Sequence, residues 1–122
     1  MAEQREVSRW RLRLVHGLYA VLIITISGVP GSDLPEATSL VSDKVLHFGE
    51  YGLLGLLGGW AYLGKRKHLW LILLFGLAFA GLDEFRQSFV PQRESDLFDF
   101  LVDLVGHVTG VLTACFLRRR SA

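Results

Sequence analysis

The sequence predicts an all-α, polytopic membrane protein with four transmembrane helices and with both termini in the cytoplasm. Hydrophobic residues make up 51% of the 122 residues. They gather in four blocks, and a bilayer core of about 30 Å is crossed by about 20 helical residues. Helices are expected because lipid offers no hydrogen-bond partners, so every backbone group must be paired within the protein. The blocks are too long for the ~10-residue strands of a β-barrel.

Each block predicts one helix within a single domain of residues 1–122: about 12–29, 45–63, 69–85 and 97–117. Pro30 and Gly31 end the first block, since proline cannot continue a helix. A long polar connection then leads to the second block, and the connection to the third is short and basic. The last connection contains Pro91 and is rich in polar groups.

Positive charge is distributed unevenly, although the net charge is only +1. Ten of the thirteen Lys and Arg residues lie near the two termini or around Lys65, whereas ten of the twelve acids lie in the other segments. Positively charged segments stay in the cytoplasm, so three separate segments agree on the orientation. Attraction to anionic lipids accounts for the same clusters, and no nucleic-acid-binding motif accompanies them.

Polar residues within the predicted helices lie at matched depths. An ionised side chain at the bilayer centre costs about 2.5–3.5 kcal/mol on insertion scales, so it must face protein, water or a partner. The candidates recur mostly at helical spacings of three or four and lie at the outer end of the four-pass arrangement: Asp43, Lys44, His47, Glu50 and Tyr51, then Asp83, Glu84, Arg86 and Gln87, then Arg93, Asp96, Asp99 and Asp103. We therefore expect an outward-facing polar pocket between the second, third and fourth helices.

Some of these residues also have a structural interpretation. Asp43 and Asp96 are suited to capping helix N-termini, and Asp83 or Glu84 could form an ion pair with an arginine. His16 has no polar neighbour on its own helix face, so we expect a structural role for it.

Glycines at small-xxx-small spacing predict close contact between helices. Gly55 with Gly59, and Gly106 with Gly110, have this spacing. His107 continues the polar stripe of the fourth helix toward the middle of the membrane, where it could also be a core histidine.

Three strings, DKVLHFGEYGLLG, DEFRQSFVPQRESDLFD and DLVGHVTG, together resemble the VanZ-like family of small bacterial membrane proteins. Their order and gaps match the motifs D-K-x-x-H-F-x-x-Y-x-x-L-G, D-E-x-x-Q-x-F-x-P-x-R and D-x-x-x-N-x-x-G-x-x-x-G. The chain departs from them at Asp103, which stands where the family usually has Asn. The resemblance implies association with the bacterial envelope, in the cytoplasmic (inner) membrane, and a link to resistance to the glycopeptide teicoplanin.

The candidate site suits an anionic ligand. Arg93 could hold a phosphate or carboxylate through two parallel hydrogen bonds. His47 could act as acid, base or nucleophile, oriented by Asp43 or Asp99. We assign catalytic candidates and ligand-binding candidates separately: His47, Asp99, Glu84 and Asp83 for the first, and Arg93, Lys44, Tyr51, Gln87, Asp43 and Asp103 for the second.

The function that we expect is binding or modification of a lipid head group, or of a lipid-linked cell-wall intermediate, at the outer surface. The acids beside His47 also suit a divalent cation as cofactor. The alternatives are a non-catalytic assembly subunit held by a structural polar network, and a small ion- or proton-coupled transporter. A membrane lipid is the expected partner, with a second copy of the chain as another.

Overall fold

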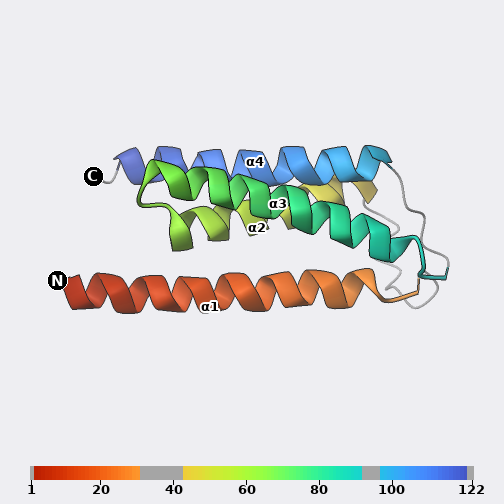
Figure 1. Cartoon of the computed structure of the whole chain (residues 1–122), viewed down its shortest axis with the longest axis horizontal. Helices are drawn as coiled ribbons and strands as arrows, with labels where there is room; N and C mark the ends of the chain where they lie inside the picture. Colours follow the sequence, from red (N-terminus) through yellow and green to blue (C-terminus); the bar gives the residue numbers. More distant parts are fainter. Residues whose placement is uncertain (1, 31–42, 92–96, 121–122) are drawn as a thin grey trace.

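Four helices make up the described part of the computed structural model. The structure describes residues 2–30, 43–91 and 97–120, without the side chains of residues 2, 4–7 and 43. The helices are α1 (Ala2–Ser27), α2 (Asp43–Tyr62), α3 (Arg66–Gln87) and α4 (Leu97–Arg120). No strand occurs within the described ranges, which confirms the all-α fold. Figure 1 shows the helices lying along one long axis, with the start of α1 and the end of α4 at the same end.

Helix ends differ from the predicted ones where basic residues flank an apolar block. α1 begins at Ala2 rather than near residue 12, and α4 continues to Arg120 rather than ending near residue 117. An apolar block marks the part of a helix that faces the bilayer core, whereas the helix itself continues through polar residues at the membrane surface. α3 begins at Arg66, directly after Lys65 in an extended conformation.

α2 and α4 pack backbone against backbone because glycines from both helices meet at their interface. A Cβ atom at Gly55 would lie 2.1 Å from the carbonyl oxygen of His107, and one at Gly110 would lie 2.0 Å from that of Gly52. No side chain fits at such distances. The close approach predicted from the small-xxx-small spacing is thus confirmed.

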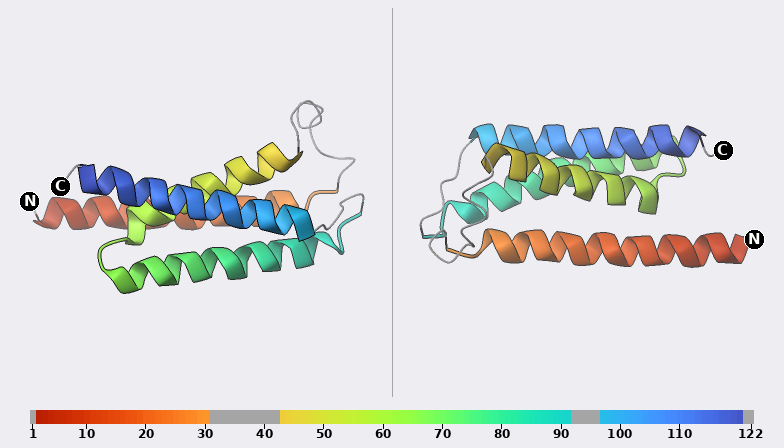
Figure 2. Two further views of the ribbon diagram at one scale, coloured as in Figure 1. Left: turned by 90° about the horizontal axis from the view of Figure 1, so that it is seen from above. Right: turned by 180° about the vertical axis from the view of Figure 1, so that it is seen from behind.

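α1 lies along one side of the other three helices, as Figure 1 and the right-hand view in Figure 2 show. Side chains that donate to backbone carbonyls connect it to them. The Tyr19 hydroxyl donates to the Glu50 carbonyl at 3.0 Å, and Nη1 of Arg86 on α3 donates to the Ile24 carbonyl at 3.2 Å. Nε of Arg13 donates to a carbonyl in the last turn of α2 at 3.4 Å. These bonds join α1 to its neighbours from Arg13 onward.

Exposure of side chains is the reverse of that in a water-soluble protein. Asp83 and Asp103 are 1% and 0% exposed, whereas Leu18 and Phe85 are 61% and 64% exposed. α1 from Ser8 onward, α3 and α4 have the length and composition to cross a membrane. α2 is not among these candidate spans, and its N-terminal end carries the polar residues of the candidate site. We conclude that the protein is an all-helical membrane protein.

The buried apolar side chains form two clusters, one toward each end of the bundle. They are Ile23, Tyr51, Leu54 and Ala80 in the first, and Leu63, Ile72, Val111 and Ala114 in the second. Tyr51 links the first cluster to the candidate site, because its ring packs there while its hydroxyl reaches an acid of α3.

Candidate functional site

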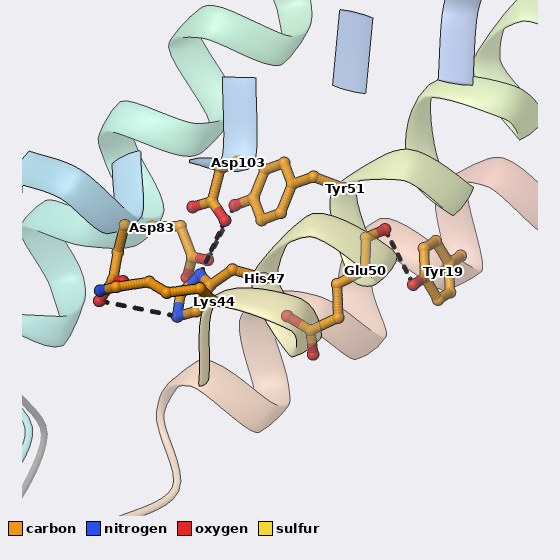
Figure 3. A network of polar contacts seen from close by, with 8 residues as sticks. Tyr19, Lys44, His47, Glu50, Tyr51, Asp83 and Asp103 are labelled. Atoms are coloured by element: carbon orange, nitrogen blue, oxygen red, sulfur yellow. Dashed lines mark hydrogen bonds and ion pairs between the residues drawn. The ribbon is translucent and has the colours of Figure 1, made fainter. Parts of the chain in front are cut away.

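His47 of α2 and Asp103 of α4 form a buried hydrogen-bonded pair. Nδ1 of His47 lies 2.7 Å from Oδ1 of Asp103, and the two residues are 6% and 0% exposed. Figure 3 shows the two side chains pointing toward each other between their helices. A donor and an acceptor held in this way fix the orientation of the imidazole.

Lys44 and Asp99 form a second pair closer to the end of the bundle. The Lys44 ammonium donates to Oδ1 of Asp99 and lies 5.2 Å from the centroid of the Phe98 ring. The Lys44 side chain is 37% exposed and that of Asp99 only 5%. This pair therefore forms the rim of the cluster, where a ligand from outside would arrive first.

Helix depth explains these partners and corrects one expectation. α2 and α4 both start at this end of the bundle (Figure 1). Lys44 and Asp99 lie on the first turns, and His47 and Asp103 lie on the second turns. Asp99, one of the two acids expected to orient His47, forms an ion pair with Lys44 and lies 3.9 Å from Nε2 of His47, and it is Asp103 that makes the hydrogen bond to Nδ1.

The last turns of α3 bring two further acids to the same place. The Tyr51 hydroxyl donates to Oδ2 of Asp83 at 2.8 Å. Glu84 is 7% exposed, and one of its carboxylate oxygens lies within 4.8 Å of ligand atoms of His47 and Asp103. Gln87 is also buried, at 4% exposure.

The structure thus brings most of the predicted site residues to one end of the bundle. Arg86 lies at the same end, where its guanidinium donates to the Ile24 carbonyl near the end of α1. Arg93 and the side chain of Asp43 lie outside the described residues, so their proposed roles stay predictions.

Several buried polar atoms of the bundle lack a hydrogen-bond partner among the described residues. Within the cluster they include Oδ1 of Asp83 and Oδ2 of Asp103. Nε2 of His107, on the same face of α4 as Asp103 and one turn deeper, is another. An unsatisfied buried polar group costs about 1–3 kcal/mol, so each of these atoms has the capacity to bind a proton donor, a water or an ion.

The grouping of His47, Glu84 and Asp103 has the dimensions of a metal site. Ligand atoms bound to one ion at about 2.0–2.6 Å cannot lie farther apart than about 4–5 Å. The three atoms here all lie within 4.8 Å of one another. One imidazole nitrogen with two carboxylate oxygens suits a divalent transition metal such as Mn²⁺ or Zn²⁺.

A comparison with known families agrees with the motifs at this site. A family model described as VanZ/LLP1 matches residues 3–118. The chain belongs to the VanZ/LLP1 family. This VanZ/LLP1 protein is also similar to an uncharacterized protein of the yeast Schizosaccharomyces pombe, with 35% identity over 108 residues. The match covers 87% of this chain and 65% of the yeast protein. No solved structure matches.

Arg13, His16 and His68 were not grouped by the sequence analysis. The structure shows that all three line one cavity at the opposite end of the bundle from His47. Arg13 precedes His16 by three residues and shares its face of α1, so the expectation that His16 has no polar neighbour on its own helix face is wrong. Their proximity to His68 depends on how α1 packs beside α3, which no local pattern reveals.

Proposed function

We propose that this VanZ/LLP1 protein binds the anionic head group of a membrane lipid at the end of the bundle that carries His47. A divalent cation held by His47, Glu84 and Asp103 would bridge the protein and a phosphate of that head group. The observation that carries the proposal is the burial of all three residues with their ligand atoms within 4.8 Å. Metal–phosphate bridging of this kind is a common use of such ligand sets.

The charge of the cluster supports a bound cation. Its described residues comprise four carboxylates, one lysine and one histidine, and five of the six side chains are buried. Buried carboxylates are stable only when they are paired, hydrogen-bonded or bound to metal. The oxygens of Asp83 and Asp103 that lack a hydrogen-bond partner among the described residues are therefore well placed to gain from an ion nearby.

The rim of the cluster suits a lipid. Lys44 is partly exposed there, and the apolar side chains of Val45, Leu97 and Phe98 around it are 60%, 72% and 56% exposed. A charged head group could reach Lys44 while its acyl chains stay against the apolar side chains. Arg93 is the residue that we expect to complete the anion site.

The membrane placement is part of the same proposal. Four crossings with both termini in the cytoplasm would place the cluster at the outer surface of a bacterial cytoplasmic membrane. A lipid-linked cell-wall intermediate is then a ligand within reach, which fits the resemblance to proteins linked with teicoplanin resistance. The similarity to a yeast protein favours a phosphate-bearing lipid of a more general kind as the shared ligand class.

His47 is the group in the cluster best suited to acid–base chemistry on a bound head group. Asp103 holds its Nδ1, much as an acid holds the histidine of a catalytic triad. Modification of the head group would rest on this residue in the state without the cation, because a histidine bound to a metal at one nitrogen and to Asp103 at the other has no nitrogen left for proton transfer.

The proposed cation site is tested by measuring the affinity of the purified chain for Mn²⁺ with electron paramagnetic resonance. We expect His47→Gln and Asp103→Asn to bind Mn²⁺ at least about tenfold more weakly, since even indirect changes around metal ligands cost 10–100-fold. Both variants should fold, because Gln keeps a donor, Asn keeps an acceptor and related sequences usually have Asn at position 103. Glu50→Gln, on α2 but outside the ligand set, is the control with a matched charge change.

The lipid is tested by native mass spectrometry with phosphatidylglycerol, with and without Mn²⁺. Addition of Mn²⁺ should increase the amount of lipid that the parent retains, and this increase should be lost in Asp103→Asn. Parent-like Mn²⁺ binding by both site variants would exclude the metal site, and lipid retention indifferent to Mn²⁺ would exclude the bridge.

A structural role in an assembly is the second candidate. The mutual pairing of His47 with Asp103, Tyr51 with Asp83 and Lys44 with Asp99 favours it. If the conservative variants fail to insert or melt far below the parent, the cluster holds the fold and this second candidate prevails.

A further inference from the structure

A cavity of about 410 Å³ lies between α1 and α3, toward the end of the bundle that carries the chain termini. Arg13 and His16 of α1, Tyr62 of α2, and His68, Leu71 and Phe75 of α3 contribute to its lining. None of these residues belongs to the cluster around His47. The cavity is therefore a separate feature that the proposed function does not use.

One side of the cavity is basic. A guanidinium and two imidazoles line it, and none of the described lining residues is acidic. His16 is 5% exposed, and its Nε2 has no hydrogen-bond partner among the described residues; the same holds for Nδ1 of His68. Arg13 lies with its guanidinium carbon 5.4 Å from the centroid of the Tyr62 ring, which fixes the charge at the mouth. This side is complementary to an anion.

The other side is apolar and open to the bilayer. Leu71 is 59% exposed, and Phe75 continues the wall inward. Trp10 and Trp70, which lie close to Arg13 and His68 in the sequence, are 63% and 69% exposed, as expected for aromatic residues at a membrane surface. The basic side therefore lies at head-group depth and the apolar side lies at acyl-chain depth.

We propose that this cavity binds a lipid with a phosphate head group from the leaflet on the side of the termini. The phosphate would lie between Arg13, His16 and His68, and an acyl chain would lie against Leu71 and Phe75. Arginine recognises phosphate through parallel hydrogen bonds, and Arg13 is exposed at the mouth of the cavity, where a head group can reach it. A bound lipid would also fill the gap between α1 and α3.

Purified full-length chain in detergent, studied by native mass spectrometry with phosphatidic acid, provides the test. EDTA is present throughout, so that the divalent cation proposed for the His47 cluster is absent and only this cavity is measured. We expect one phosphatidic acid per chain. Arg13→Gln should weaken binding by about tenfold or more, as loss of a charge-assisted hydrogen bond does.

Two variants separate a defined site from general attraction. Arg11→Gln removes the same charge from a position on the same helix that is exposed like Arg13 but does not line the cavity, and it should bind within about twofold of the parent, as exposed charges without a defined partner contribute little. The imidazole of His16 lies between the rings of Tyr62 and Phe75, with 5.4 Å between ring centroids in both cases. His16→Phe keeps an aromatic ring there but removes the nitrogens. This variant should fold as the parent does and should bind phosphatidic acid more weakly.

The results that would overturn the proposal are equally definite. Equal weakening by Arg11→Gln and Arg13→Gln would mean that diffuse charge attracts the lipid. Displacement of the lipid by inorganic phosphate at the same concentration would mean that the cavity takes the free anion. Parent-like binding by both Arg13→Gln and His16→Phe would place the lipid elsewhere. Asp103→Asn should bind like the parent here, whatever happens at the cluster around His47.

Discussion

At the scale of single residues, partner choice follows depth in the membrane. Lys44 pairs with Asp99 on the first turns of α2 and α4, and His47 pairs with Asp103 on the second. Asp103 is of special interest because related sequences usually have Asn there. Either residue can accept a hydrogen bond from His47, but only Asp adds a negative charge. The chain thus keeps the pair and gains a buried negative charge.

The bond between Tyr51 and Asp83 provides a prediction on stability. Asp83 is 1% exposed, and its other oxygen lacks a hydrogen-bond partner among the described residues. Tyr51→Phe should therefore lower the free energy of unfolding by about 1–3 kcal/mol, because it leaves a buried carboxylate without its donor. The measurement is the melting temperature of the purified variant in detergent.

A double-mutant cycle is the control for that prediction. Replacing both partners with apolar groups removes the unsatisfied atom, so Tyr51→Phe with Asp83→Leu should cost less than the sum of the two single changes. Simple additivity would show that the two side chains do not depend on each other.

At the scale of helices, the glycine contacts decide how α2 meets α4. Gly110→Ala would place a Cβ 2.0 Å from the Gly52 carbonyl oxygen, and a backbone atom cannot give way as a flexible side chain can. We expect a loss of at least about 1–3 kcal/mol, the usual cost of overpacking, measured as a lower melting temperature.

Gly49→Ala is the matched control on α2, since nothing lies within 4 Å of its added Cβ. Alanine stabilises a helix by up to about 1 kcal/mol relative to glycine, so this variant should melt at or above the parent temperature. A similar loss in both variants would point to helix formation in general rather than to the contact with α4.

The helices themselves could be predicted from the sequence, but their contacts only in part. Apolar blocks predicted four helices at the right places, and the small-xxx-small spacing predicted the close contact of α2 with α4. The extension of α1 back to Ala2 was missed, because polar residues at a membrane surface carry no apolar signal. Helical spacing predicted which polar residues share a face but not which atoms meet. That choice depends on the depth and rotation of each helix against its neighbour.

At the scale of the whole molecule, polar groups face inward and apolar groups face outward. His47, Asp83, Glu84 and Asp103 are buried at one end of the bundle, and His16 is buried toward the other. Large apolar side chains are exposed on all four helices. This arrangement is stable only where apolar solvent surrounds it. Under the two proposals above, the polar regions at opposite ends would bind lipids from opposite leaflets.

The direction in which the bundle crosses the membrane is open to a direct test. Ten of the thirteen basic residues belong to the two terminal segments and the connection around Lys65, and the start of α1 and the end of α4 lie together at one end of the bundle (Figure 1). Because such segments remain in the cytoplasm, a reporter fused at the C-terminus should be cytoplasmic and one inserted near Thr38 should be extracytoplasmic. α1, α3 and α4 are long and apolar enough to cross a membrane, whereas α2 is not among these candidate spans. The reporter at Thr38 therefore tests whether α1 crosses, and the comparison of the two reporters tests the other three helices. Reporters on the same side would mean that an even number of helices, rather than three, cross the membrane between Thr38 and the C-terminus. The His47 cluster could then not lie outside while both termini stay inside.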